Sequence, residues 1–292
     1  MTRRRLVPFL LLAFLLATGP PPAFGQPQAA PPPEVAVAPP DITQELRLRD
    51  GTTAVGRIEA VDGTRVTFRT LAGATLTLER SDIVSLTTVG GRAAGREFWR
   101  DDPNPTRLFF GPTGRPLKRG DVYLGVYEIF IPFVQVGVTD RFSIGGGTPL
   151  IFGGGGDRPF WLTPKFTVVS RPRTQVAVGA MHMLNIDGDN LGVAYGALTQ
   201  GSRDTAVTLG VGYAYARGED AGAPVLMLGG EHRVHRHMKL VTENYVFEGG
   251  GIASAGVRFI TGRLSADLGL AMPLGVDEFF VFPMVNFVWT FR

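Results

Sequence analysis

The sequence contains no cysteine among its 292 residues, which excludes a disulfide scaffold and any metal site built on cysteine. After residue 18, no apolar run approaches the roughly 18 residues that a membrane-spanning helix requires. The chain is, in contrast, rich in glycine, with 39 residues, and 10% of it is aromatic. This composition favours a glycine-rich β-structure over a helical one.

Net charge gives little information about partners. The chain has 29 Lys and Arg against 26 Asp and Glu, but residues 1–25 hold three Arg and no acid. The remainder therefore carries 29 − 3 = 26 basic residues against 26 acidic ones, and we expect no nucleic-acid partner.

The first 25 residues have the features of a secretory signal peptide. Arg3, Arg4 and Arg5 precede an apolar run over 6–18, and the small residues around Gly25 suit cleavage there. Residues 26–40 are rich in Pro and Ala and predict an extended linker. Secretion through this signal is the first functional expectation.

Residues 41–89 alternate apolar and polar side chains in short segments. Leu46 and Leu48, or Val66 and Phe68, fall on one face, and the Asp-Gly and Ala-Gly pairs at 50–51, 62–63 and 72–73 mark reversals. The pattern predicts a small closed barrel of about five strands. The stretch "DGTTAVGRIEAVDGTRVTFRTLAGATLTLERSDI" resembles SH3-like and Sm-like barrels. The resemblance implies a fold and not a function, and a secreted chain is a poor candidate for RNA binding.

Residues 90–119 form a Gly-, Arg- and Pro-rich connector that excludes a long element, and 108–110 has the character of a short strand. From 120 to 292, about twelve strands follow one another, among them 121–131, 141–152 and 174–186. Most are about 10–13 residues long, which suffices to cross a bilayer at a tilt. Within 204–216, large apolar side chains alternate with Thr, Gly and Ala. A lipocalin-like soluble barrel needs charged outer faces, so we expect an all-β, twelve-stranded transmembrane barrel with its apolar face toward lipid.

The last strand supports a membrane location. Phe287, Trp289 and Phe291 share one face, and this resembles the C-terminal signal of bacterial outer-membrane barrels, although here Arg292 follows the final aromatic residue. The resemblance implies the barrel-insertion machinery as a partner. The alternative is a buried strand of a soluble sandwich.

A second resemblance covers the start of the barrel. The residues "NPTRLFF" and "GVTDRFSIGGG" within 103–150 resemble the opening of a family of uncharacterised bacterial outer-membrane β-barrel proteins. The resemblance implies fold and location only.

The turns predict an orientation. If both ends of a twelve-stranded barrel are periplasmic, the turns on that side, at 140–141, 171–173, 202–204, 235–237 and 262–263, all contain Arg, and the opposite loops contain acids. Basic turns suit anionic phospholipid head groups, and acidic loops suit divalent-bridged lipopolysaccharide. The outward loops are short, which argues against a long loop folded into the lumen.

Seven charged residues fall on inward faces and are candidates for lining the lumen: Lys165, Glu231, Arg233, Lys239, Glu243, Arg258 and Asp267. Such charges either select solutes in a pore or pair to close the barrel. We expect a small-solute channel of unspecified solute. The alternative is an envelope anchor, neither pore nor enzyme, whose 41–89 domain binds a periplasmic protein or peptidoglycan.

We expect no catalytic site, metal or cofactor. The histidines of "HRVHRH" (232–237) have no carboxylate beside them for a metal. His182, with Asn185 and Asp187 nearby, lacks a serine partner for hydrolysis. Asp101, Asp102 and Asn104 lack the spacing of a calcium loop and are expected to cap turns instead.

Overall fold

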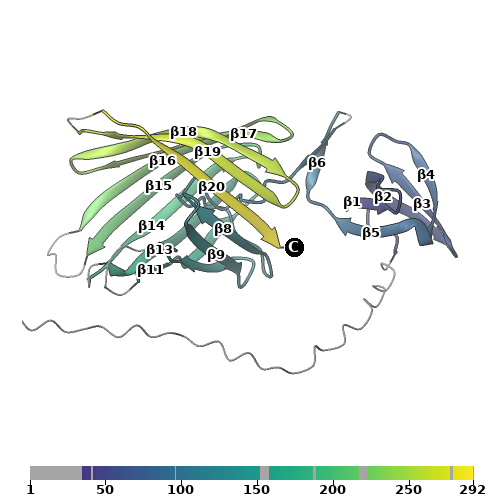
Figure 1. The fold of residues 1–292 in the computed structure, drawn as a ribbon, viewed down its shortest axis with the longest axis horizontal. Coiled ribbons are helices and arrows are strands. Elements are labelled where there is room, and N and C mark those ends of the chain that lie inside the picture. The colour runs from purple at the N-terminus through teal and green to yellow at the C-terminus, as the bar shows by residue number, and fades with distance from the viewer. Residues whose placement is uncertain are drawn as a thin grey trace, which may run out of the picture.

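The computed structural model describes residues 35–40, 42–95, 97–151, 158–186, 189–216, 222–276 and 279–291. A large barrel and a small five-stranded sheet lie side by side, connected through a two-stranded hairpin (Figure 1). The predicted signal peptide, at 1–25, and most of the linker lie outside the described residues. In the described part of the chain, no helix has both the length and the apolar character to cross a membrane.

The small sheet is antiparallel and has the strand order β4-β3-β2-β1-β5. Its strands are β1 (Gln44–Leu48), β2 (Thr53–Asp62), β3 (Arg65–Thr70), β4 (Thr75–Glu79) and β5 (Ile83–Thr88). The chain reverses at Gly51, Gly63 and Gly73, each with positive φ, which confirms the turns predicted from sequence. The inward face of the alternation forms one core around Leu46, Phe68 and Ile83.

The hairpin of β6 (Gly91–Ala94) and β7 (Glu97–Arg100) links this sheet to the barrel. Arg100 forms an ion pair with Glu45 of the small sheet, and Arg92 forms one with Asp204 of a barrel turn, at 2.6 Å. The hairpin and the small sheet therefore sit at the barrel end that carries the Arg-containing turns (Figure 1).

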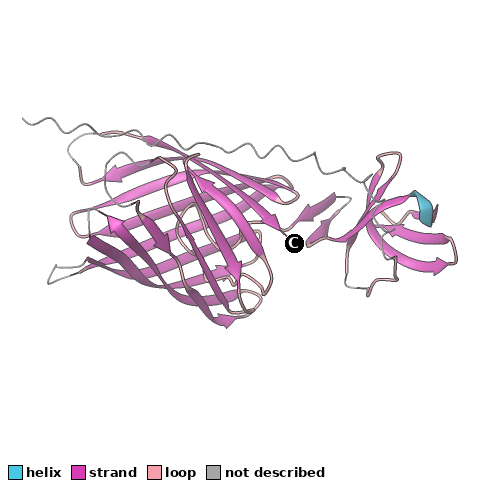
Figure 2. Ribbon diagram, turned by 60° about the horizontal axis from the view of Figure 1, so that its bottom comes forward, coloured by secondary structure: helices cyan, strands magenta, loops and turns pink. Residues whose placement is uncertain are grey.

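The barrel is closed and antiparallel, as Figure 2 shows. It consists of β8 (Val122–Tyr127), β9 (Ile131–Gly137), β10 (Phe142–Gly147), β11 (Phe160–Leu162), β12 (Lys165–Ser170), β13 (Thr174–Ile186), β14 (Asp189–Gly201), β15 (Thr205–Ala216), β16 (Ala223–His235), β17 (Met238–Phe247), β18 (Gly250–Thr261), β19 (Leu264–Leu274) and β20 (Phe282–Phe291). Both β11 and β12 pair with β10 and with β13, so together they fill one strand position in the barrel wall. The pairing of β20 with β8 closes a twelve-stranded barrel. The predicted strand number is confirmed.

On one side of the barrel the strands are shorter than predicted. Strands β8, β9 and β10 span six or seven residues, whereas β13 to β20 span ten to thirteen. The strands expected over 121–131 and 141–152 are therefore too long. Glu128 and Ile129 take up positive φ and turn the chain after β8, and Pro164, which has no N–H to donate, stands in the break between β11 and β12.

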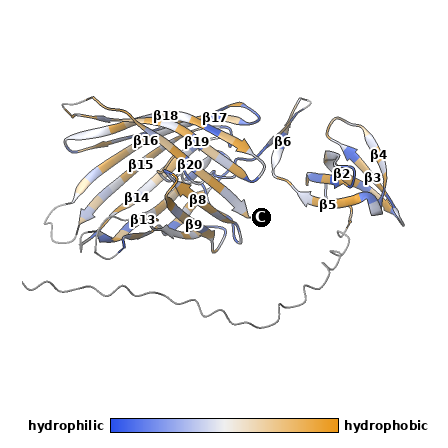
Figure 3. Cartoon of the chain, viewed as in Figure 1, coloured by the Kyte–Doolittle hydropathy of each residue, from blue (hydrophilic) through white to orange (hydrophobic). Residues whose placement is uncertain are grey.

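The outer surface has the alternation expected of a lipid-facing barrel. Val207, Leu209 and Val211 of β15 are 55%, 47% and 56% exposed, while the alternate residues Thr208 and Gly210 are buried inside. Orange and pale or blue positions alternate along the strands in Figure 3. Phe287, Trp289 and Phe291 of β20 lie on the exposed face; their role in insertion remains a prediction.

Candidate functional site

The connector enters the barrel. Residues 101–117, called the internal segment below, lie inside the lumen and bond to strands around its circumference. Thr106 contacts Tyr123 of β8, the Gly114 N–H bonds to Thr199 of β14, and the Pro103 carbonyl accepts a bond from Thr290 of β20. The short outward loops argue only against a long loop that enters the lumen from their end. The segment that fills the lumen comes instead from the N-terminal side of the barrel.

Leu108 and Phe109 place an apolar core inside the lumen. Both are fully buried, and they pack with Met227, Val241, Ala271 and Met284. The structure forms no strand over 108–110; a single bridge between Arg107 and Pro112 marks a tight reversal instead. The two apolar side chains at its tip bind the segment to the inner faces of strands β16, β17, β19 and β20.

Glu243 of β17 holds the tip of the internal segment. Its carboxylate accepts backbone N–H bonds from Phe109 at 2.7 Å, Phe110 at 3.1 Å and Gly111 at 3.0 Å, and one from the Tyr245 hydroxyl at 2.7 Å. A Cβ at Gly111 would collide with Tyr245 and Met227. A buried carboxylate with several donors is satisfied without a cation.

A network of buried charges fixes the start of the internal segment. Arg258 pairs with Asp267 at 2.6 Å and with Asp102 at 3.1 Å, and Lys239 pairs with Asp102 at 2.8 Å. Glu231 joins the network through Lys239 at 3.5 Å and through Arg115 at 2.5 Å. The network therefore contains three cations and three acids, and its charge is balanced.

Asp102 is the centre of this network and also shapes the segment. Its other carboxylate oxygen accepts the Asn104 N–H at 2.9 Å, which is the turn-capping role expected from sequence. Arg258 also donates to the backbone carbonyls of Asn104 and Leu108. Barrel and segment thus satisfy many of each other's buried polar groups.

Two further cations bind mainly backbone carbonyl groups and not acidic side chains. Lys165 of β12 donates to the carbonyls of Thr106, Thr113 and Arg115, at 3.2, 3.3 and 2.9 Å. Arg233 of β16 donates to the carbonyls of Arg100 and Arg236 at 2.5 Å each and lies 3.6 Å from Asp204. Lys165 therefore holds the internal segment between Thr106 and Arg115. Arg233 holds the chain at Arg100, just before the segment begins.

The structure brings all seven lumen candidates inside, each with a buried side chain. Lys239, Glu231, Arg258 and Asp267 form one network, whereas Lys165, Glu243 and Arg233 each act separately on the internal segment or its entrance. Sequence reasoning missed the partners on the connector itself, chiefly Asp102, Arg107 and Arg115. Buried charges require partners, so seven charges in one lumen were a sign that a further polar segment had to enter it.

The histidines lie away from the lumen network. His182 contacts the hydroxyl of Tyr215 at 3.0 Å, and His232 contacts Thr205 at 2.8 Å. His235 and His237 have ring centroids 5.9 Å apart. Within the described residues, no three acidic or His side chains gather as a metal site would require; Asp187, the third residue weighed beside His182, lies outside those residues.

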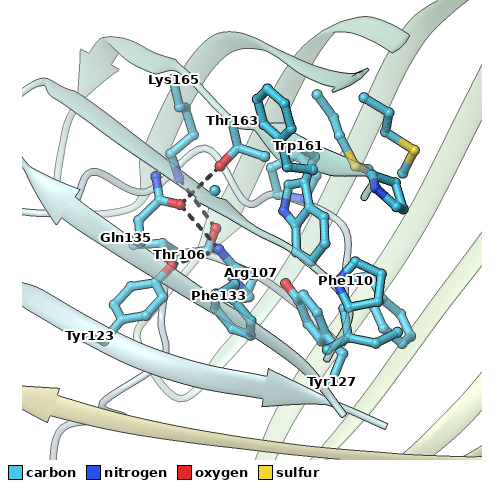
Figure 4. Close-up of a pocket in the computed structure, with 18 of the residues that line it drawn as sticks. Thr106, Arg107, Phe110, Tyr123, Tyr127, Phe133, Gln135, Trp161, Thr163 and Lys165 are labelled. Atoms are coloured by element: carbon cyan, nitrogen blue, oxygen red, sulfur yellow. Dashed lines mark hydrogen bonds between the residues drawn. The ribbon is translucent and has the colours of Figure 1, made fainter. Parts of the chain in front are cut away.

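A cavity of about 340 Å³ lies on the other side of the internal segment, away from the small sheet. Arg107, which belongs to the internal segment, and Lys165, which binds that segment, lie at the inner end of the cavity (Figure 4). Pro149, Phe160 and Met183 also line it. Rings of Tyr127, Phe133 and Trp161 form much of its wall. We call it the outer cavity.

No protein-family model and no curated protein sequence matches the chain. Among solved structures, the chain is similar to "KdgM porin in complex with disordered oligogalacturonate", with 8% identity, a TM-score of 0.47, and 59% of this chain and 98% of that chain covered. It is also similar to "Salmonella typhi OmpF complex with Daunomycin", with 6% identity, a TM-score of 0.33, and 86% and 96% covered. A third is "Outer-membrane expressed OmpT of Vibrio cholerae", with 10% identity, a TM-score of 0.34, and 86% and 95% covered. At these scores the likenesses carry no information on what this chain binds or transports.

Proposed function

We propose that this chain is an outer-membrane β-barrel that conducts small solutes, and that the internal segment keeps it closed at rest. The observation that carries the proposal is a closed barrel with an apolar exterior and a polar lumen that is filled by a non-covalently held segment. Transmembrane barrels share this polarity, with apolar side chains toward lipid and polar ones toward the lumen. The solute remains unspecified.

The orientation follows the turns. With the Arg-containing turns and the small sheet on the periplasmic side, the outer cavity opens toward the cell surface. The small sheet then resides in the periplasm, where a protein or peptidoglycan is the partner within its reach. Phe287, Trp289 and Phe291 are recognised by the insertion machinery. Lipid and lipopolysaccharide surround the apolar outer surface of the barrel.

A structural anchor is the second candidate. The balanced network at the inner end favours it, because a lumen closed by mutually satisfied charges needs no opening to be stable. In that case the barrel holds the small sheet at the membrane, and the sheet carries the function.

Cell fractionation with a heat-modifiability gel tests the location. An outer-membrane barrel gives a detergent-insoluble band that migrates faster unheated than heated. A soluble periplasmic band without a shift would place the apolar stripes in a core and remove the membrane proposal.

Planar-bilayer recording with a reversible lock tests conduction. Leu108 and Gly229 suit a cysteine pair, because a Cβ at Gly229 would lie 3.4 Å from Cγ of Leu108 and the chain has no other cysteine. The Leu108→Cys, Gly229→Cys variant should be silent when oxidised and conduct when reduced. If the reduced variant and the unmodified chain never conduct, the channel proposal fails.

Deletion of 42–88 separates the two candidates. A channel retains its conductance without the small sheet. An anchor loses its cellular phenotype although the barrel still inserts, as the heat-modifiable band reports.

A further inference from the structure

The outer cavity contains positive charge without an acidic partner. In the part of the chain that the structure describes, neither Arg107 nor Lys165 forms an ion pair. The inner network, in contrast, matches three cations with three acids. The barrel therefore balances its charges at the periplasmic end and leaves two cations unbalanced at the inner end of the outer cavity.

Arg107 is the cation with unused donors. The three ammonium donors of Lys165 are all taken by carbonyls. Among the described residues, Arg107 donates to protein acceptors only through Nη2, which bonds to the Tyr123 hydroxyl at 2.9 Å and to Gln135 Oε1 at 3.3 Å. Its Nε is buried and has no hydrogen-bond partner among the described residues. Since an unpaired buried donor is costly, the guanidinium is suited to receive an acceptor from a ligand.

The walls of the cavity are aromatic. The guanidinium of Arg107 lies 4.4 Å from the ring centroid of Phe133, whose other neighbour, Tyr127, is stacked on it at 4.2 Å. Phe110 lies 4.9 Å from Tyr127, and Trp161 lines the cavity nearby (Figure 4). An aromatic cage ordinarily attracts a cation, but here Arg107 already occupies it, so a cationic ligand would meet repulsion.

The size of the cavity limits the ligand. About 340 Å³ is at the lower end of the roughly 300–1,000 Å³ typical of small-molecule sites. This suits one fused or single ring system with an acidic group and excludes a long polymer.

We propose that the outer cavity binds a small aromatic carboxylate, with its carboxylate on Arg107 and its ring against Trp161 and the Phe133–Tyr127 stack. Binding holds whether or not the ligand passes the internal segment, so this inference goes beyond the proposed channel. The carboxylate supplies Arg107 with an acid, which it does not have among the described residues, and the ring replaces water on an apolar wall.

Calorimetry on the full chain in phosphatidylcholine nanodiscs tests the site, with empty nanodiscs as the blank. The probes are 2-naphthoate, its neutral amide 2-naphthamide and the cation 2-naphthylmethylammonium. We expect naphthoate to bind about tenfold or more tightly than the amide, which is the lower end of what a hydrogen bond to a charged group contributes, and the cation to bind weakest. Equal affinity for acid and amide overturns the proposal and leaves a merely apolar pocket.

Arg107→Met provides the matched variant, because it removes the charge and keeps most of the packing on the rings. It should lose the preference for the acid while it still binds the amide. Arg173→Met, on an exposed periplasmic-end turn, is the control and should bind as the unmodified chain does. Naphthoate binding by Arg107→Met at full strength refutes the role of Arg107. If that variant gives no heat-modifiable band, the three-probe series on the unmodified chain decides alone.

The oxidised Leu108→Cys, Gly229→Cys lock separates this inference from the channel. Binding should persist in the locked barrel, because the internal segment that carries Arg107 stays in place. A site that binds in a barrel that never conducts supports the inference and refutes only the channel. Loss of naphthoate binding in the lock refutes the placement of the site on the closed segment.

Discussion

Replacing Glu243 by Gln should loosen the internal segment without changing the shape of the side chain. The carboxylate accepts three backbone N–H bonds, from Phe109, Phe110 and Gly111, at 2.7–3.1 Å. An amide oxygen in the same place accepts them as neutral bonds. A hydrogen bond to a charged group is stronger than a neutral one by about 1 kcal/mol, so three bonds lose roughly 3 kcal/mol.

Part of this loss is offset. A neutral amide costs less to bury than a carboxylate, and the Tyr245 hydroxyl, which donates to Glu243 at 2.7 Å, is able to accept from the new NH₂ group. The net change is then about 1–2 kcal/mol, which raises the undocked population of the segment roughly 5–30-fold.

Open probability in planar bilayers measures this population. Glu243→Gln should open more often than the unmodified chain by that factor, and the oxidised Leu108→Cys, Gly229→Cys lock should suppress the openings. Glu248→Gln makes the same charge change on an exposed turn and should have no effect. Openings that persist in the oxidised lock would show that the current does not depend on the internal segment, and an unchanged open probability in Glu243→Gln would show that this carboxylate does not hold it.

Three further predictions concern stability. Arg258→Met removes the cation paired with Asp267 and one of the two paired with Asp102. We expect the free energy of unfolding to fall by ~3–5 kcal/mol and the heat-modifiable band to convert at a lower temperature. The control Arg173→Met should leave that temperature unchanged. Leu209→Arg puts a charge on the lipid face of β15, where Leu209 is 47% exposed, and should cost up to ~2–4 kcal/mol; its yield of folded barrel in vesicles should fall, and normal folding would contradict a lipid-facing position. Phe68→Ala empties the core of the small sheet at a cost of ~3–5 kcal/mol, so protease should cut 42–88 while the barrel band remains; Val84→Ala, at a residue 50% exposed, should resist like the unmodified chain.

The sequence predicts the tall part of the barrel wall well because a bilayer imposes a period of two on every strand that crosses it. Strand β13 has the predicted bounds of 174–186. The inward and outward faces of β15 also agree with the prediction. Turn residues such as Gly63, which needs positive φ, mark the ends of strands directly.

The short strands β8, β9 and β10 are not predictable in the same way. The alternation continues through 121–131, yet the strand ends at Tyr127, because Glu128 and Ile129 turn the chain with positive φ. Neither residue type favours that backbone, so the turn is imposed by its surroundings. The Glu128 carboxylate accepts the Val285 N–H at 3.3 Å, a long-range contact that no local pattern contains.

The internal segment shows the same limit more sharply. Residues 101–117 have no periodicity, and their Pro and Gly content is typical of a connector. Their place in the lumen depends on complementarity with side chains more than 100 positions away, such as the bond from the Phe109 N–H to Glu243. Leu108 and Phe109 were the local hint, since two large apolar residues in a polar connector need a core.

The presence of charges in the lumen therefore does not tell whether they line a pore or close the barrel. The partner of each charge does. Lys239, Arg258 and Glu231 use their charge in ion pairs. Removing Arg258 takes the cation from Asp267, and removing Glu231 takes the acid from Arg115. Lys165 and Glu243 use theirs to bind the backbone of the internal segment. Once the segment leaves, Lys165 loses these three bonds and Glu243 keeps only the bond from the Tyr245 hydroxyl. Of the seven lumen candidates, only these two would then face an open lumen as charges without an ion pair. Their replacement should change the ion selectivity of the open barrel, whereas changes within the network around Asp102 should change its stability.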